Sequence, residues 1–118
     1  MKKLYILLPV MALLFITACK KENDSAEQRT VEYSIDCPNC FVVYYDANGQ
    51  QVSLQDQNSS WKQTIEGKPG GIVLLAAQNS SGSPAAVTGV IKLNGAVLAE
   101  RTTYCPISGT VLVTDTLP

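Results

Sequence analysis

From residue 30 to the C-terminus, apolar and polar positions alternate in short runs that are separated by turn residues. In VEYSI, the side chains of Val31, Tyr33 and Ile35 fall on one face of an extended chain. Such alternation, in segments rich in Val, Ile, Thr and Tyr, predicts β-strands. No segment keeps a helical period of 3.6 residues, so we expect an all-β domain.

Asn-Gly pairs separate several of the predicted strands. Asn48-Gly49 supplies the positive φ of a hairpin turn, and Asn94-Gly95 joins two alternating runs with a two-residue loop, which indicates a type I′ turn. The further segments expected to form strands are FVVYYD, QVSL, SSWKQTI, IVLLAAQN, AVTGVIKL, AVLAERTT and GTVLVTDT.

The run IVLLAAQN, residues 72–79, is continuously apolar until its last two residues, and we expect a strand that is buried on both faces. About seven short strands within residues 30–118 predict a small antiparallel β-sandwich of immunoglobulin type.

The first eighteen residues have the pattern of a secretory signal peptide. Lys2 and Lys3 precede LYILLPVMALLFITA, an apolar stretch too short to span a bilayer comfortably. The stretch ends in ITAC, which resembles the lipobox of bacterial lipoprotein precursors. That resemblance implies cleavage of residues 1–18 and addition of diacylglycerol and a fatty acid such as palmitate to Cys19. The acyl chains would hold the protein at the outer membrane, facing the periplasm or the cell surface.

A polar segment follows the lipobox cysteine. Residues 19–29 read as the lipidated cysteine and a flexible tether, with a root-mean-square span of roughly 17 Å. Without residues 1–18 the chain keeps seven Lys and Arg against ten Asp and Glu, a net charge of 7 − 10 = −3. This mild acidity argues against a nucleic-acid partner. Histidine is absent, which excludes Ser-His-Asp and Cys-His catalytic sites within this chain.

The order of short motifs also resembles a known family. VEYSI, VVYYDANGQ, SSWKQTI, LLAAQN and GVIKLNGAVLAE resemble, in this order, the domain of the MmpS-type transport accessory proteins. The resemblance implies a small β-sandwich at the outer side of a membrane, beside a large lipid exporter. This chain differs in its anchor, which is a cleaved lipoprotein signal and not a retained transmembrane helix.

A few single residues are candidates for binding. Trp61 is expected at the core or its edge, with ligand stacking as the alternative. Tyr44 and Tyr45 point to opposite faces of a strand, and the outward one would join Tyr104 in any binding surface. The carboxylates of Asp36, Asp46, Asp56, Glu66 and Asp115 lie at strand ends and turns, where turn chemistry accounts for them.

Two tripeptides match a bacterial O-glycosylation pattern. DSA at 24–26 and DTL at 115–117 have the order Asp, Ser or Thr, apolar residue, so Ser25 and Thr116 are candidate acceptors in terminal segments that we expect to be exposed.

Three cysteines remain after lipidation of Cys19, and an oxidising envelope favours pairing of two of them. A Cys40–Cys105 bridge is favoured by loop entropy, at roughly 4.3 kcal/mol against roughly 1.9 for Cys37–Cys40. The turn residues between Cys37 and Cys40 bring their Cα atoms within about 7 Å, however. We predict the Cys37–Cys40 bridge and keep Cys105 as the alternative partner. Three thiols without histidine make a poor zinc site, so no metal or cofactor is expected.

These features favour a non-enzymatic, lipid-anchored binding or accessory module that contacts an envelope protein or glycan, with a membrane transporter as one candidate neighbour. One alternative is an envelope thiol-disulfide protein that uses Cys37 and Cys40, although the segment after them is strand-forming and not helical. A purely structural surface lipoprotein is the other alternative.

Overall fold

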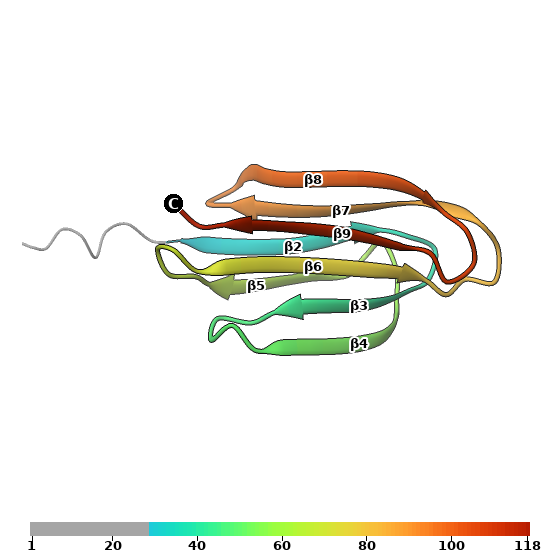
Figure 1. Ribbon diagram of the computed structural model, residues 1–118, viewed down its shortest axis with the longest axis horizontal. Helices are drawn as coiled ribbons and strands as arrows, with labels where there is room; N and C mark the ends of the chain where they lie inside the picture. The colour runs from blue at the N-terminus through green and yellow to red at the C-terminus, as the bar shows by residue number, and fades with distance from the viewer. Residues whose placement is uncertain (1–28) are drawn as a thin grey trace, which may run out of the picture.

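The computed structural model describes residues 29–118, which form eight β-strands and contain no helix (Figure 1). Each of the segments that the sequence predicts to be extended forms its own β-strand. The strands are β2 (Thr30–Asp36), β3 (Cys40–Tyr45), β4 (Gln51–Gln57), β5 (Lys62–Glu66), β6 (Ile72–Asn79), β7 (Ala85–Leu93), β8 (Ala96–Cys105) and β9 (Thr110–Thr116). The all-β sandwich is therefore confirmed, with eight strands in place of about seven. Within these described residues, nothing helical is long and apolar enough to cross a membrane.

Two antiparallel sheets of four strands make up the sandwich, with the orders β5-β2-β7-β8 and β4-β3-β6-β9. Only β3–β4 and β7–β8 are hairpins within one sheet, and every other connection crosses between the sheets. Counted from β2 as the first strand, β3 and β6 are the second and fifth, and β7 and β8 are the sixth and seventh. Both pairs are hydrogen-bonded, and strands at the same positions also pair in an immunoglobulin constant domain. The first strand, β2, pairs with β5 and β7, the fourth and sixth strands. In an immunoglobulin domain the first strand pairs with the second.

The core lies between the sheets, where alternate residues of the strands meet. The predicted inward set of β2 is buried, with Val31 and Tyr33 at 0% exposure and Ile35 at 5%. The sheets approach closely at Gly89, where an added Cβ would lie 2.9 Å from a methyl group of Val113. A direct polar tie also joins the two layers, because the Tyr33 hydroxyl donates a hydrogen bond of 2.8 Å to the carbonyl oxygen of Tyr45.

The Asn-Gly turns form as predicted. Asn94 and Gly95 have φ values of 51° and 88°, which places both central residues of the β7–β8 turn in the left-handed region, as a type I′ turn requires. The β3–β4 turn is longer. Its Gly49 has a φ of 77°, and the Asp46 carboxylate accepts the backbone N–H groups of Asn48 and Gln50 at 2.9 Å each.

The expectation that β6 is buried on both faces is wrong. Its inward residues are buried, but the outward Leu74 and Ala76 are only half-buried and Ile72 is 58% exposed. The described chain supplies two layers, and burial on both faces would need a third layer over β6.

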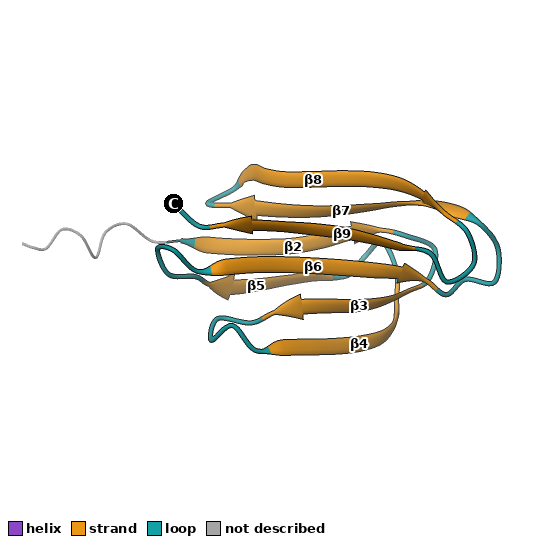
Figure 2. Cartoon of the chain, viewed as in Figure 1, coloured by secondary structure: helices purple, strands orange, loops and turns teal. Residues whose placement is uncertain are grey.

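Connections gather at the two ends of the sandwich (Figure 2). The end that holds Arg29 is called the entry end here. The chain enters and leaves there side by side, since Arg29 Nε donates to the carbonyl oxygen of Pro118 at 2.7 Å. The opposite end, called the far end, carries the β2–β3, β4–β5, β6–β7 and β8–β9 connections.

Candidate functional site

The predicted bridge between Cys37 and Cys40 is present at the far end, where the chain crosses from β2 to β3. The two Cα atoms are 6.2 Å apart. Cys105 is unpaired and buried at the end of β8, so it is not the bridge partner.

The surroundings of the bridge fit a structural role. The Ser59 hydroxyl accepts the Cys37 backbone N–H at 2.9 Å and donates to the Asp36 carboxylate at 2.7 Å, which holds the loop between the sheets. Cys37 and Cys40 are 1% and 0% exposed, and Cys40 is the first residue of strand β3. A redox-active pair needs an accessible sulfur and commonly a helix N-terminus that lowers the thiol pKa, and neither is found at this loop.

Trp61 lies at the edge of the core, in agreement with the predicted position. Its ring stacks at a tilt on Tyr44, with ring centroids 5.7 Å apart, and Tyr44 lies 5.3 Å from Tyr33. Tyr33 ends this aromatic row inside the sandwich, and burial there raises the pKa of its hydroxyl to about 12. The row packs the two layers together and leaves the Trp61 ring half-buried.

The tyrosines expected to share a binding surface lie apart. Tyr44 points inward and Tyr45 outward, as the alternation predicts. Tyr45 is at the entry end of β3, whereas Tyr104 is 70% exposed near the far end of β8, in the other sheet. The two side chains therefore belong to different surfaces.

The acidic residues do not gather into a metal site. Within residues 29–118, no group of three or more His, Cys, Asp or Glu side chains is placed to hold a metal ion. Asp46 caps the β3–β4 turn, and Asp56 lies in the irregular part of β4 with a φ of 58°.

The modification candidates fall partly outside the described residues. Cys19, Ser25 and the predicted signal peptide 1–18 lie in the part of the sequence that the structure does not describe. Thr116 is exposed at the end of β9, and its backbone N–H donates to the Asp115 carboxylate at 2.7 Å. Leu117, the third residue of that tripeptide, is buried at 3% exposure, so the motif is partly held in the fold.

One outer sheet face is apolar and uncharged. The register of the β4-β3-β6-β9 sheet aligns Val43 with Ala76, and Ala76 with Leu112 across the next pair of strands. Leu112 is 46% exposed. We call this surface the apolar face, and define it by Phe41, Val43, Tyr45, Ile72, Leu74, Ala76 and Leu112.

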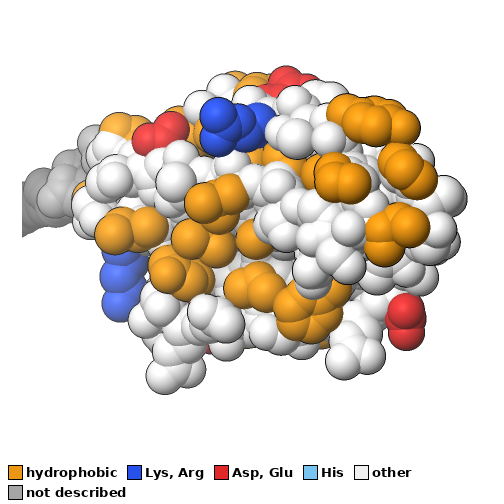
Figure 3. All heavy atoms as spheres, turned by 45° about the vertical axis from the view of Figure 1, so that its right-hand side comes forward, with side chains coloured by type: hydrophobic (Ala, Val, Ile, Leu, Met, Phe, Trp, Pro, Cys, Tyr) orange, Lys and Arg blue, Asp and Glu red, His pale blue; other side chains and the backbone are white. Residues whose placement is uncertain are grey.

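The neighbours of the apolar face are polar, and most of them carry no charge. The uncharged outward positions around it on β4, β6 and β9 are Gln51, Ser53, Gln55, Gln78, Thr110, Thr114 and Thr116, and the exposed Asp56 lies at its margin, in the irregular part of β4 beside Phe41. Figure 3 shows this surface obliquely, with hydrophobic side chains gathered over the middle of the face and the charged side chains around its margin. Contiguous apolar surfaces that are exposed are typical of interaction sites.

The other sheet has a different outer face. Its outward positions place Glu32 opposite Lys92, a favourable pairing of opposite charges. Thr88 and Thr102 share a hydrogen bond of 2.8 Å between their hydroxyl groups. We call this surface the polar face, and define it by Glu32, Lys62, Thr64, Glu66, Thr88, Lys92, Glu100 and Thr102. Val97 and Tyr104 are exposed on the same side, along the edge strand β8.

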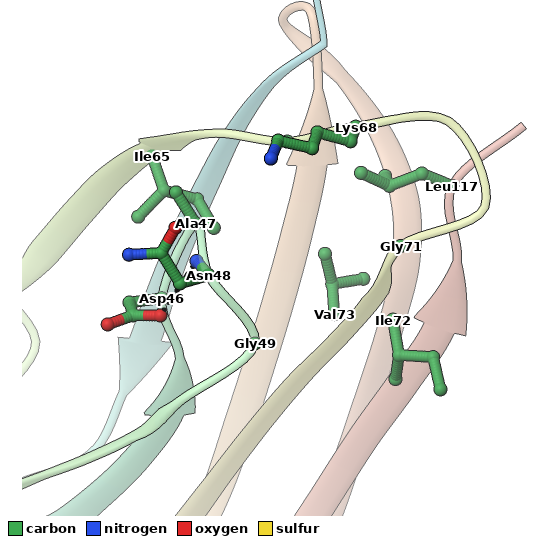
Figure 4. Close-up of a pocket in the computed structure, with 11 residues that line it drawn as sticks. Asp46, Ala47, Asn48, Gly49, Ile65, Lys68, Gly71, Ile72, Val73 and Leu117 are labelled. Carbon is green, nitrogen blue, oxygen red and sulfur yellow. Dashed lines mark hydrogen bonds between the residues drawn. The ribbon is translucent and has the colours of Figure 1, made fainter.

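A pocket of about 290 Å³ opens at the entry end, between the β3–β4 turn and the β5–β6 loop (Figure 4). Val73 and Leu117 form its apolar floor, and the Lys68 side chain extends across it towards the β3–β4 turn. The Asp46 carboxylate at the rim is engaged by the backbone of its own turn. This volume lies just below the range typical of small-molecule sites, and the polar groups at the rim serve local structure.

No protein-family model and no curated protein matches the chain. The choice of a candidate site therefore depends on the geometry of the structure. The most distinctive surface is the apolar face, which analysis of the sequence missed as a site. The sequence feature that could have revealed it is the run IVLLAAQN, which forms β6 and is apolar on both of its sides. The outward side was expected to be buried, but the described residues do not cover it.

Proposed function

We propose that this chain is a lipid-anchored, non-enzymatic binding module of the bacterial envelope that works through its apolar face. The observation that carries the binding role is a sheet face with seven apolar side chains and no charge, in a domain whose other face is charged. The solvated face of an antiparallel sheet is ordinarily polar. An apolar one is favourable when a partner covers it.

The anchor follows from the ITAC sequence and the polar segment after it. With Cys19 acylated, the tether would join the sandwich at Arg29, so the entry end would be nearest the membrane. The strands would then be roughly perpendicular to the membrane, and the apolar face would point in a direction parallel to the membrane plane. This orientation favours a neighbour held in the same membrane.

Protein suits the apolar face better than glycan, because the hydroxyl groups of a glycan would lose water without charged or amide partners at the centre of the face. The resemblance to MmpS-type accessory proteins suggests a membrane transporter as one class of neighbour. An immunoglobulin-like classification is part of this proposal, and two of the strand pairings support it.

The anchor is tested by Cys19→Ser in the full chain. We expect the variant to leave the membrane fraction and to lose labelling by a radioactive fatty acid. Membrane association that stays at the level of the unmodified sequence would contradict the lipid anchor.

The binding surface is tested by a photo-reactive amino acid placed at Val43 in membranes that carry the full chain. We expect covalent adducts from Val43 and none from Thr64, an exposed position on the polar face that serves as the matched control. Adding Leu112→Lys should remove the adducts, because a charge on the apolar face loses water when the face is covered. Equal adducts from both positions would contradict a role for this face.

A further inference from the structure

We propose that the partner of the apolar face is a second copy of this chain, packed sheet against sheet about a twofold axis. This inference rests on the proposed function, in which the apolar face is the binding surface. The four strands of the sheet would form the inner layers of a four-layer dimer, with both polar faces outside.

The charge distribution favours a copy of the same chain as partner. A twofold axis places one surface against itself, so any charge near the axis meets a like charge. The apolar face carries no charge and therefore meets itself without repulsion. The polar face would bring its acidic side chains, such as Glu32 and Glu100, towards their own copies.

The anchor selects one of two face-to-face arrangements. An axis parallel to the strands keeps both entry ends on the same side, whereas an axis across the strands places them at opposite ends. The chain enters the fold at Arg29, so each copy would be tethered to the membrane through its entry end. Both entry ends reach one membrane without stretching a tether only when the axis runs along the strands.

This arrangement defines which residues meet. β3 and β6 are the central strands, so an axis between them lays β3 of one copy over β6 of the other. Val43 is aligned with Ala76 within the sheet, and it would lie over Ala76 of the second copy. The small Ala76 side chain leaves room for Val43, while Tyr45 would meet Leu74.

The size of the face indicates a reversible dimer. Four strands about 4.8 Å apart and seven residues long cover about 19 by 23 Å, which is about 440 Å² per copy and roughly 900 Å² for the two copies. This total is smaller than the interfaces of stable specific complexes and has the size of weak, transient ones. Confinement to a membrane would raise the effective concentration of the second copy.

The test uses charge-swapped full chains in membranes. Two differently tagged copies are co-expressed, one with Val43→Glu and the other with Ala76→Lys, and co-purification of the tags is measured after mild cross-linking. We expect co-purification of the unsubstituted copies, at least a tenfold loss when both copies carry Val43→Glu, and recovery for the mixed pair, in which Glu at 43 lies over Lys at 76. Thr64→Lys, on the polar face, is the matched control and should leave co-purification unchanged.

The register is tested by cysteine pairs and a bismaleimide that spans about 10 Å, the spacing of packed sheets. A strong Phe41→Cys to Gln78→Cys product between copies supports the axis along the strands. A dominant Phe41→Cys to Tyr45→Cys product would overturn that orientation, because it is expected when the axis crosses the strands.

The outcomes separate the two proposals. If the tags do not co-purify while the Val43 photo-adduct contains a different protein and is lost with Leu112→Lys, the dimer is overturned and the binding module stands. If neither the co-purification nor the adduct depends on the apolar face, both proposals are overturned.

Discussion

The two outer faces of the sandwich differ although their strands share the same alternation and the same core. On the β5-β2-β7-β8 sheet, most outward positions carry charged or hydroxyl side chains, some of which pair as Thr88 does with Thr102, although Val97 and Tyr104 are exposed on its edge strand β8. On the β4-β3-β6-β9 sheet, the central outward positions are apolar, including Val43 and Ala76. Stability of the sandwich requires only the inner faces to be apolar. The second apolar surface is therefore not needed by the sandwich itself, which supports the proposed contact with a partner.

The largest expected effect compares the two sides of β6. Leu75 is fully buried, and Leu75→Ala should lower the unfolding free energy by about 2–5 kcal/mol, because it leaves a cavity between the sheets. Leu74 is its outward neighbour, and Leu74→Ala should cost about 1 kcal/mol or less. Denaturant unfolding of the two variants measures the difference. Equal losses would show that the outer side of β6 is covered as fully as the inner side.

A pH titration tests the tie between the layers. The pKa of Tyr33 is about 12 in the folded chain against about 10 when unfolded, so the unfolded state releases its proton first as the pH rises. The contribution of the protonated Tyr33 hydroxyl to the unfolding free energy is fully present below pH 10. About 2–3 kcal/mol of unfolding free energy should be lost between pH 10 and 12. Tyr33→Phe has no such proton and should flatten this part of the profile; an unchanged profile would contradict the assignment.

Removal of the disulfide should have an intermediate effect. The bridge closes a loop of four residues, and replacing both Cys37 and Cys40 by Ala should cost about 2 kcal/mol through the greater freedom of the unfolded chain. The bridge lies at the far end and not on either outer face, so photo-adducts at Val43 should persist in the variant under conditions where it is folded. Loss of those adducts from the folded variant would show that the crossing loop also positions the apolar face.

The smallest effect is expected for charges added to the outer faces. Leu112→Lys and Thr64→Lys both alter exposed positions, and each should change the unfolding free energy of the isolated subunit by about 0.5 kcal/mol or less. The faces should differ in binding, with only Leu112→Lys reducing contact between copies. A large loss of stability in Leu112→Lys alone would indicate a structural role for the apolar face.

Much of the local structure follows from the sequence. Alternation places Val31, Tyr33 and Ile35 on one side of β2, and the Asn94-Gly95 pair selects its turn because both residues tolerate a positive φ. The Cys37–Cys40 bridge was predictable because a short turn restricts the distance between their Cα atoms. The candidate site was not predictable in the same way, because whether Tyr45 and Tyr104 share a surface depends on the strand order, which places β3 and β8 in different sheets.

By itself, the sequence determined the strands, their turns and the two alternating sides of each strand, because these depend on residues that are neighbours along the chain. The tertiary structure alone decided which strands pair, that Cys105 is buried at the end of β8, and that the outward side of β6 is left open. An apolar run shows that a side chain avoids water, but it does not show which layer covers it. That depends on contacts between residues distant in the chain, and here on whether the covering layer belongs to this chain or to another.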